Sequence, residues 1–446
     1  MSRSGDAVGV GLIGFGTIGT GVVKILQRNA AVIEQRLGFS LNLVRIADLD
    51  TGRDRGVDLS GIRFDDDSDG LIADPHVQIA VELIGGSDVA RRLIQGAIDA
   101  GKHVVTANKA LLALHGKEIF DAAARRGVDV AFEASVGGGI PILRSLREGL
   151  AANRILSIHG IMNGTTNYML TEMERTGEPF EVVLERAREL GYAEADPSFD
   201  VDGIDAAHKL TLLATMAFGA ELTFKEIPTE GIRCLTPVDF EAAREFGYRI
   251  KLLGIAKAHA EGDGADDRIE VRVHPTLIPA TSLLSSVDGA MNAIAVTGDA
   301  VGATLYYGAG AGELPTASAV VADLMEIARE IRRGSAGRVA PLSYMPHRIE
   351  PKPLIPLGEL IGCTYLRFTA VDRPGVLAQI ASCLGDHEIG IESVIQKARG
   401  AAAESVPVIV KTHPARELAV RGALEIIDRL PDVTAPTCLI RIEEGL

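Results

Sequence analysis

A dense group of carboxylates followed by a single lysine occupies residues 191–209, GYAEADPSFDVDGIDAAHK. The carboxylates are those of Glu194, Asp196, Asp200, Asp202 and Asp205, and the lysine is Lys209. Asp196-Pro197 and Asp202-Gly203 are turn signals, whereas the following IDAAHKLTLLATMAF is apolar at helical spacing. We therefore expect Asp205 and Lys209 to share one face of a largely buried helix, where the lysine can donate or accept a proton. An ordinary ion pair within the helix is the alternative.

A glycine-rich turn near the start of the chain has the sequence of a nucleotide-binding loop. An apolar run, Val8–Ile13, precedes an amphipathic helix pattern at residues 22–37 and is followed directly by Gly14, Phe15, Gly16, Thr17, Ile18 and Gly19. Glycines in this place permit a tight turn and let a pyrophosphate approach the positive N-terminus of the helix. Strand, loop and helix together predict a dinucleotide site, and a glycine-rich turn without a ligand is the alternative.

The end of the second predicted strand bears on which dinucleotide is bound. This strand, LNLVRIAD, ends at Asp48, whose carboxylate can accept hydrogen bonds from the adenosine ribose and would repel a 2′-phosphate. We therefore expect NAD rather than NADP. Two observations keep NADP open: the spacing from Gly19 exceeds the usual ~20 residues, and arginines lie nearby at Arg45, Arg53 and Arg55.

Further strand and helix patterns alternate up to about residue 133. Strand patterns cover VQIAVELIG, KHVVTANKA and VDVAFEA, and helix patterns cover residues 89–100 and 111–126. This order predicts a Rossmann-type, doubly wound parallel sheet for residues 1–133. Thr106 and Lys109 follow the carboxyl end of one strand, where such sheets bind ligands, so Lys109 can face the cofactor or the substrate. A solvated loop lysine fits that position equally well.

Two loops in the middle of the chain carry groups that can bind a cation or a substrate. Residues 133–141, EASVGGGIP, expose many backbone carbonyls beside the carboxylate of Glu133, and such oxygens suit a monovalent or divalent cation. A plain crossover between domains is the alternative. In the segment NGTTNY, Gly164 and Thr165 belong to a run of turn and helix-cap formers that can equally hydrogen-bond a polar substrate.

Residues 134–312 are predicted to form an α+β domain, an open sheet with helices on one face. Helix patterns at about 165–175 and 180–190 precede the acidic stretch, and four strand patterns follow it. The glycine-rich turn Gly308–Gly312 then offers a second possible phosphate site at a helix N-terminus. We expect the helix after this turn, within residues 313–340, to return to the first domain.

The C-terminal part of the chain has the pattern of a separate module. Residues 341–362 contain five prolines, which is typical of an extended linker. Patterns in residues 363–446 follow the order β-α-β-β-α-β, which predicts a ferredoxin-like sandwich. The turn DRPGV at residues 372–376 makes this module resemble an ACT domain, an amino-acid-binding regulatory unit. A purely structural, dimer-forming unit is the alternative.

Composition restricts the class of protein. The chain has 446 residues, of which 47% are hydrophobic, so it can bury two or three cores. Its net charge of −15 disfavours nucleic acid or an anionic membrane surface as a partner. No signal peptide or membrane-spanning run is indicated. A reducing cytoplasm and the absence of zinc or a disulfide framework are expected from four widely spaced cysteines, Cys234, Cys363, Cys383 and Cys438.

These segments together resemble homoserine dehydrogenase of the aspartate pathway over residues 6–340. The glycine loop, TANK, EASVGGGIP, MNGTTNY and EADPSFDVDGIDAAHK occur in that family's order, and the run from Ala187 to Lys209 matches its signature. Because the chain begins at the nucleotide-binding strand, we expect the monofunctional form. The resemblance implies reduction of L-aspartate 4-semialdehyde to L-homoserine with NAD or NADP, in the biosynthesis of threonine, methionine and isoleucine.

The resemblance also implies roles for particular residues. Lys209 matches the family's catalytic lysine, Asp205 the adjoining carboxylate, and Lys109 a lysine that reaches the cofactor and the substrate. Glu194 and Asp200 match acidic residues near the substrate amino group, where negative charge complements an ammonium. Further matches are backbone contacts to the cofactor at Gly191 and Gly312, and a sodium site at Glu133 with the carbonyls of Val136, Gly138 and Ile140.

Regulation, cofactor preference and assembly follow from the same resemblance. Threonine, the end product of the pathway, is the expected effector of residues 363–446. Members that prefer NADP often carry a basic residue at the end of the second strand, where this chain has Ala47 before Asp48. We also expect a homodimer or a homotetramer in the cytoplasm.

Two other functions compete with this one. An aldehyde dehydrogenase would need a nucleophilic cysteine, and none of the four cysteines lies in a recognisable nucleophile context. A catalytically silent NAD-binding sensor would have no use for Lys109, Lys209 and the acidic stretch together. An assay with homoserine and each cofactor distinguishes the three possibilities.

Overall fold

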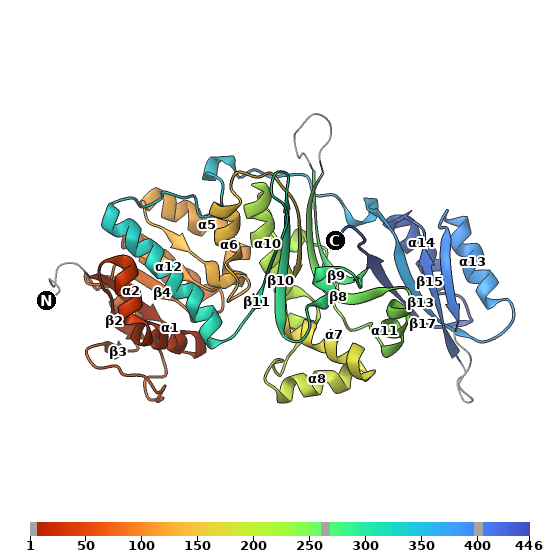
Figure 1. Cartoon of the computed structure of the whole chain (residues 1–446), viewed down its shortest axis with the longest axis horizontal. Coiled ribbons are helices and arrows are strands. Elements are labelled where there is room, and N and C mark those ends of the chain that lie inside the picture. Colours follow the sequence, from red (N-terminus) through yellow and green to blue (C-terminus); the bar gives the residue numbers. More distant parts are fainter. Residues whose placement is uncertain (1–6, 260–267, 397–404) are drawn as a thin grey trace. The chain divides into compact units, whose positions relative to one another are not determined.

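The computed structural model describes residues 7–259, 268–396 and 405–446. The chain, coloured along its sequence in Figure 1, folds into two compact units. The first unit comprises residues 1–155, 208–226 and 296–351, and the second comprises residues 156–207, 227–295 and 352–446. These units cut across the boundaries expected at residues 133 and 312, because the chain passes between the units several times. The division into four consecutive parts stays a prediction.

A six-stranded parallel sheet carries the first unit, in the order β3-β2-β1-β4-β5-β6. Its strands are β1 (Val8–Ile13), β2 (Leu41–Ala47), β3 (Arg63–Asp65), β4 (Ile79–Glu82), β5 (His103–Thr106) and β6 (Val130–Ala131). The strand order reverses between β1 and β4, and doubly wound sheets bind ligands beside such a reversal. The Rossmann-type sheet predicted from the sequence is confirmed.

Helices from both ends of the sequence complete the first unit. They are α1 (Thr17–Arg28), α2 (Ala30–Leu37), α3 (Ser68–Ala73), α4 (Asp88–Asp99), α5 (Lys109–Arg126) and α12 (Glu313–Arg333). α12 packs along α1 (Figure 1), and its Val320 and Leu324 enter the same hydrophobic core as Val10 and Leu12 of β1. A helix more than 290 residues further along the chain thus supports the strand that leads into the glycine loop.

One local prediction in this unit was wrong, and two short elements were not predicted. The single helix expected at residues 22–37 begins earlier, at Thr17, and is interrupted at Asn29, which separates α1 from α2. Asparagine competes for backbone hydrogen bonds and favours helix ends over helix interiors. The sequence also gave no indication of β3 and α3, because the segment before them is rich in glycine and aspartate and reads as a turn.

The strands of the second unit follow the order β10-β7-β8-β9-β17-β13-β15-β14. In the middle part of the chain these are β7 (Ile155–Ile161), β8 (Tyr248–His259), β9 (Arg268–Pro279) and β10 (Met291–Gly298), and the fourth predicted strand is β11 (Gly302–Ala309). The helices of this part are α7 (Gly164–Thr176), α8 (Phe180–Glu189), α9 (Ser198–Val201) and α11 (Pro237–Glu245). α7 and α8 confirm the two helices expected before the acidic stretch.

The C-terminal residues have the predicted β-α-β-β-α-β order. The elements are β13 (Thr364–Val371), α13 (Val376–Asp386), β14 (Ile391–Gln396), β15 (Ser405–Thr412), α14 (Glu417–Ile427) and β17 (Val433–Ile442). The strands pair antiparallel in the order β17-β13-β15-β14, and both helices pack on one core with β13 and β15. The third element of this order was expected from the pattern IESVIQKARG at residues 391–400, and residues 397–400 of it lie outside the described residues.

One pairing in the second unit was not expected. Arg441 and Ile442 of β17 pair in parallel with Thr276 and Leu277 of β9, so the C-terminal strands continue the middle sheet. The proline-rich segment 341–362 is also tied down at two points. In the first unit, the backbone amide of Glu221 donates a hydrogen bond to the carbonyl of Glu350 at 2.9 Å. In the second unit, the backbone amide of Ile269 donates a hydrogen bond to the carbonyl of Pro353 at 3.0 Å.

Candidate active site

The loop after β1 has the shape of a phosphate cradle. Gly14 has a φ of +97°, and a Cβ there would lie 2.7 Å from the carbonyl carbon of Leu83. A Cβ on Gly19 would collide with the carbonyl oxygen of Gly14, whereas the space beside Gly16 is open. α1 starts after Gly16 without a side-chain cap, so its first amides can bind an anion. The loop therefore fits the pyrophosphate of a dinucleotide.

Asp48 holds the glycine loop as well as placing a charge at the end of β2. Its Oδ2 accepts a hydrogen bond from the amide of Phe15 at 2.5 Å, and its Oδ1 accepts one from the amide of Asp50 at 2.8 Å. The guanidinium of Arg55 lies 4.6 Å from the centre of the Phe15 ring and donates to the Phe15 carbonyl at 2.5 Å. The carboxylate assigned to the ribose thus also fixes the backbone of the cradle.

The three arginines because of which NADP was retained as a possible cofactor differ in their surroundings. Arg45 is only 2% exposed and pairs with Asp65 and Asp67 at 2.9 and 3.0 Å. Arg55 is committed to the loop contacts above and to the carbonyl of Arg53, to which it donates at 2.8 Å. Arg53 itself is exposed. Arg45 therefore cannot reach a 2′-phosphate without breaking its buried ion pairs.

A buried carboxylate that the sequence analysis missed lies at the end of β4. Glu82 accepts hydrogen bonds from the hydroxyl of Thr106 at 2.7 Å and from the amide of Ile84 at 2.9 Å. Burial raises the pKa of Glu82, and these hydrogen bonds oppose the rise. Thr106 accepts in turn from the amide of Asn108 at 3.0 Å, so Glu82 fixes the loop that leads to Lys109. A carboxylate inside an apolar strand was the available signal.

Two more residues predicted at the cofactor lie at helix starts in the first unit. Lys109 is the first residue of α5, directly after the capping Asn108. Gly312 caps α12 with a φ of +127°, a conformation that favours glycine. The next residue, Glu313, accepts a hydrogen bond from Lys24 of α1 at 2.7 Å. The second glycine turn therefore ends beside the helix that the first one begins.

In the second unit, Asn163 joins two of the predicted acidic residues. Its Nδ2 donates to Asp200 Oδ1 at 2.6 Å and to Asp205 Oδ2 at 2.8 Å. Its Oδ1 accepts from the amide of Thr166 at 2.8 Å and so caps α7. Because the cap engages the amide oxygen, the amide nitrogen faces the two carboxylates. The sequence placed Asn163 in a run that could form a turn or cap or hydrogen-bond a substrate, but its link to the two carboxylates was not predicted.

The other residues predicted at the substrate lie around this cluster in different environments. Thr165 donates its hydroxyl to the carbonyl of Tyr192 at 2.8 Å. A Cβ on Gly164 would lie 2.8 Å from the carbonyl oxygen of Ala290, so glycine is required there for packing. Glu194, which was predicted at the substrate, is exposed, and so is Gly191, which was predicted at the cofactor. The structure thus brings Asp200 and Asp205 together through a direct partner and leaves Glu194 at the surface.

The predicted catalytic pair lies on α10 (Ile204–Phe218). Asp205 stands in the first turn of this helix, and Lys209 follows one turn later. Their exposed fractions are only 4% and 8%. A carboxylate in the first turn of a helix interacts favourably with the helix dipole. The helix expected from the apolar spacing is confirmed, and both charged side chains are buried on it.

The carboxylate of Glu133 caps a helix. Its two oxygens accept hydrogen bonds from the amides of Leu143 and Arg144, at 2.9 and 2.8 Å, at the start of α6 (Ile142–Arg144). Nearby, Gly138 has a φ of +43°, and a Cβ there would lie 2.6 Å from the carbonyl oxygen of Gly310. Within residues 7–259, 268–396 and 405–446, no three His, Cys, Asp or Glu side chains are grouped to hold a metal ion. A cation in this loop would therefore depend on backbone carbonyls.

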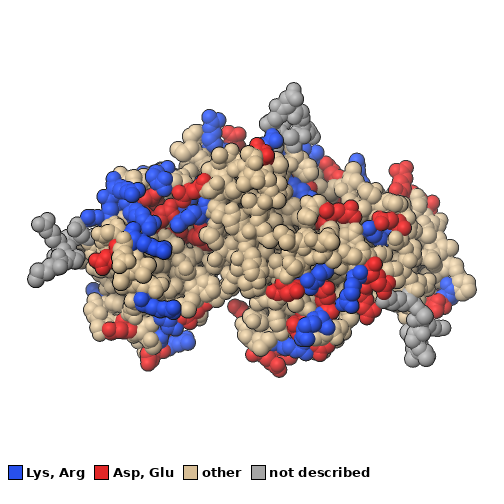
Figure 2. Space-filling model, viewed as in Figure 1, with Lys and Arg blue, Asp and Glu red and all other residues tan. Residues whose placement is uncertain are grey.

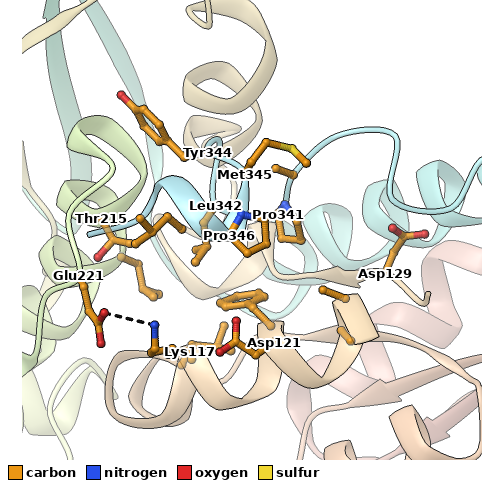
Figure 3. A pocket seen from close by; sticks show the side chains of 18 of the residues that line it. Lys117, Asp121, Asp129, Thr215, Glu221, Pro341, Leu342, Tyr344, Met345 and Pro346 are labelled. Carbon is orange, nitrogen blue, oxygen red and sulfur yellow. Dashed lines mark hydrogen bonds and ion pairs between the residues drawn. The ribbon is translucent and has the colours of Figure 1, made fainter. Parts of the chain in front are cut away.

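A cavity of about 310 Å³ in the first unit lies between α5, the second half of α10 and residues 336–349 (Figure 3). Its walls are mainly apolar and include Leu112, Phe120 and Leu342. At one end Lys117 and Glu221 form an ion pair at 3.2 Å, drawn as a dashed line in Figure 3. None of the predicted site residues lines this cavity, so we do not assign it to the active site.

Charges of both signs are interspersed on the face of the molecule in Figure 2. Many of the charged side chains take part in ion pairs. In the first unit, for example, Arg144 and Arg147 both pair with Glu326. No helix in the described parts of the chain is long and apolar enough to cross a membrane.

The fold and the cradle define the class of protein. A parallel sheet in the order 3-2-1-4-5-6, an open helix N-terminus after a glycine loop and an acidic residue after the second strand are the features of a dinucleotide-binding domain. The buried carboxylate and lysine on α10 add groups that can move a proton. The chain therefore has the parts of a dinucleotide-dependent oxidoreductase.

Comparison with known proteins gives the particular family. Models of the homoserine dehydrogenase NAD binding domain and of homoserine dehydrogenase match residues 14–133 and 141–325. A homoserine dehydrogenase of Pseudomonas aeruginosa is 47% identical over 443 residues, which are 98% of this chain and 99% of that protein. A crystal structure of a homoserine dehydrogenase from Thiobacillus denitrificans is 48% identical, with a TM-score of 0.90 over 98% of each chain. The chain belongs to the homoserine dehydrogenase family.

The activity follows from this membership. The protein is an oxidoreductase that interconverts L-aspartate 4-semialdehyde and L-homoserine with a nicotinamide cofactor. A hyperthermophilic archaeal homoserine dehydrogenase solved with NADPH is also similar, with 26% identity and a TM-score of 0.59 over 72% of this chain and 97% of that chain. The family and the reaction expected from the sequence are confirmed.

Proposed function

We propose that Lys209 exchanges the proton of this reaction, with Asp205 as its partner. The observation that supports this most is the burial of both side chains one turn apart on α10. When it is bound, the nicotinamide cofactor exchanges a hydride with the carbon atom that becomes the aldehyde. The oxygen on that carbon must gain or lose a proton in the same reaction. A lysine shielded from bulk water can exchange that proton with the substrate rather than with solvent.

The acidic cluster is assigned to the substrate's ammonium group. Asn163 holds the carboxylates of Asp200 and Asp205 together through its two amide protons, and this concentrated negative charge suits a substrate ammonium. Glu194 adds negative charge at the surface. The remaining residues proposed for the substrate and for its approach to the cofactor are Gly164, Thr165 and Lys109.

The cofactor is assigned chiefly to the two glycine turns, with NAD preferred over NADP. The preference rests on Asp48 at the end of β2 and on the engagement of Arg45 in buried ion pairs. The proposed cofactor residues are Gly14, Phe15, Gly16, Thr17, Ile18, Gly19, Asp48, Thr106, Lys109, Gly191 and Gly312.

A monovalent cation, Na⁺ in the simplest case, is proposed at Glu133 with the carbonyls of Val136, Gly138 and Ile140. Hard cations favour oxygen ligands, and positive φ values at Gly137 and Gly138 let this loop turn sharply. The Glu133 carboxylate can contribute without giving up its helix cap, because each of its oxygens has a second lone pair. The charge of the ion would offset the burial of this carboxylate.

Control and assembly complete the proposal. Threonine is the proposed inhibitor, acting at residues 363–446 as at an ACT domain, and the β-α-β-β-α-β arrangement of these residues supports this. A homodimer or a homotetramer is proposed because β11 exposes two large apolar residues, Leu305 and Tyr307. A cytoplasmic location agrees with the free thiols of all four cysteines.

The substrate assignment is tested by comparing L-homoserine with 4-hydroxybutyrate, which lacks the amino group. We expect kcat/KM for the analogue to be lower by roughly 10²-fold, because the carboxylates lose their charged partner. Asp200→Asn should reduce the difference in kcat/KM between L-homoserine and 4-hydroxybutyrate. Asp202→Asn is the matched control, because Asp202 pairs with Arg233 at 2.5 Å and is not assigned to the site. Equal kcat/KM for the two compounds would refute the assignment.

A further inference from the structure

Two cysteines that lie far apart in the sequence meet in the second unit. Sγ of Cys438 lies 3.1 Å from Sγ of Cys234, although the two residues are 204 positions apart in the sequence. Cys438 is on β17 and is only 3% exposed, whereas Cys234 lies in the loop before α11 and is exposed. One thiol of the pair can therefore be reached by reagents in solvent, and the other is shielded behind it.

Neighbouring contacts hold the two sulfurs at this distance. Cys438 pairs with Arg367 of β13 in the strand ladder. Arg367 donates through Nη2 to the carbonyl of Cys234 at 2.9 Å and through Nε to the carboxylate of Asp239 at 2.7 Å. Tyr365 of β13 donates to the same carboxylate at 2.8 Å. Because Asp239 belongs to α11, both this helix and the loop before it are tied to β13, and β13 sets the position of β17.

The two thiols differ in how readily they ionise. The hydrogen bond from Cys438 lowers the pKa of Cys234, and this effect outweighs the opposing effects of burial and of the Asp239 charge; the charge of Arg367 adds to the lowering. The same bond, together with burial, raises the pKa of Cys438. Oxidants react with the thiolate rather than with the thiol. Cys234 is therefore the residue that reacts first with the oxidant, and Cys438 is in place to attack the oxidised sulfur.

We propose that Cys234 and Cys438 form a reversible disulfide within one chain when the protein meets a hydroperoxide. The thiolate of Cys234 attacks one peroxide oxygen, the O–O bond breaks, and a sulfenic acid forms, while the departing oxygen takes a proton from solvent and leaves as water or an alcohol. Sγ of Cys438 then attacks the sulfenic sulfur, the S–O bond breaks, and the thiol proton leaves with the hydroxide as water. The two thiols give up two electrons, which reduce one peroxide.

The geometry favours this second step. A disulfide bond is about 2.05 Å long, so the sulfurs need to approach each other by about 1 Å. Rotation of the exposed Cys234 side chain about its Cα–Cβ bond can supply this movement without breaking the backbone contacts of its loop, while Cys438 stays in the ladder with β13. A dithiol reductant restores both thiols by thiol–disulfide exchange.

The bond would lock the last strand of the chain to the segment before α11. A cross-link between residues so far apart restricts the unfolded chain strongly, so the oxidised protein should resist unfolding. In reducing compartments, disulfides are mostly transient and sense the redox state. A pair with one exposed thiol and one buried thiol suits such a reversible lock.

The test uses the full-length protein, first reduced and then exposed to hydrogen peroxide. Free thiols are counted after denaturation, and peptides from a non-reducing digest are identified by mass spectrometry. We expect free thiols to fall from four to two, with Cys234 and Cys438 in one cross-linked peptide pair, and dithiothreitol to restore all four. The oxidised protein should also unfold at a higher temperature than the reduced protein.

Serine variants provide the controls. Cys363→Ser removes a thiol whose pKa is raised by burial, and this variant should still form the cross-link. Cys438→Ser should form none, and its Cys234 should proceed to sulfinic acid because no thiol resolves the sulfenic acid. The proposal is overturned if peroxide leaves all four wild-type thiols free, or if Cys234 is oxidised to the same product in the wild type and in Cys438→Ser.

Discussion

The side-chain nitrogen of Asn163 lies 2.8 Å from the carboxylate of Asp205. The same nitrogen lies 2.6 Å from Asp200, so each of its two protons has a carboxylate acceptor. Two like charges are thereby held close together by one neutral group. Because the oxygen of the same amide caps α7, the position of the acidic pair depends on where that helix begins.

The substitution Asn163→Asp distinguishes the two roles of this residue, which are to cap α7 and to donate hydrogen bonds to Asp200 and Asp205. Aspartate caps helices about as well as asparagine, so α7 should remain intact. The two donors are replaced by a third carboxylate, and we expect kcat/KM for homoserine to fall by roughly 10²-fold. Ser282→Ala removes another side-chain cap in the same unit and should lower only the unfolding temperature. Wild-type kcat/KM for Asn163→Asp would show that the amide does not position the carboxylates.

Asp48→Asn tests the cofactor preference. The substitution removes the charge that repels a 2′-phosphate, while the amide oxygen can still accept from Phe15. The ratio of kcat/KM with NADP to kcat/KM with NAD should rise by about tenfold or more. Asp50→Asn changes a nearby exposed carboxylate and should leave the ratio unchanged. An unchanged ratio in Asp48→Asn would count against the role of this charge.

Short sequence patterns predicted most helices and strands correctly. Contacts between residues that are distant in the sequence could not be predicted from such patterns. The strand, glycine loop and helix starting at Val8 obey periodicities that one short segment can show. The link between Asn163 and Asp205 was hidden because asparagine before a helix already has an adequate explanation as a cap. Cys234 and Cys438 likewise lack any spacing motif, and only the pairing of β17 with β13 brings them together.

Asp323 should make the stability of the first unit depend on pH. Burial raises the pKa of Asp323 to about 8, and the nearby charge of Glu133 adds to this rise. In the unfolded chain the pKa of an aspartate is about 3.9, so the fold favours the protonated form. The contribution of this group to the free energy of unfolding is therefore greatest below about pH 4 and is lost as the pH rises toward 8.

Asp323→Asn imitates the protonated form and should remove this dependence. Its amide oxygen can still accept the bond that Asp323 takes from the amide of Glu133 at 2.8 Å. The unfolding free energy of the variant, relative to wild type, should increase between about pH 5 and about pH 8. Asp69→Asn alters an exposed ion pair with Arg92 and is the control. The same relative stability at both pH values in Asp323→Asn would contradict this account.

Threonine should inhibit the full-length enzyme by binding residues 363–446. Inhibition at a distance requires tighter binding to a less active state, with a coupling of typically about 1–3 kcal/mol. Calorimetric titration of L-threonine, with D-threonine as the control, measures the binding directly. Deleting residues 363–446 would be a poor test, because β17 pairs with β9. An absence of binding heat, together with full activity at millimolar threonine, would exclude this effector.

Lys209→Ala is the variant that bears on the catalytic assignment. Loss of a positioned proton donor typically lowers turnover by about 10²-fold or more, while binding of the cofactor should be unaffected. Lys117→Ala is the matched control, because Lys117 is an exposed lysine of the first unit that pairs with Glu221. Circular dichroism and the affinity for NADH show whether each variant is folded and binds the cofactor.

The turnover of Lys209→Ala with saturating L-homoserine and cofactor tests the central claim most directly. We predict a value at least about 10²-fold below wild type, with an unchanged dissociation constant for NADH and with Lys117→Ala close to wild type. A folded Lys209→Ala enzyme that turns over at nearly the wild-type rate would contradict the assignment of proton transfer to the buried lysine of α10.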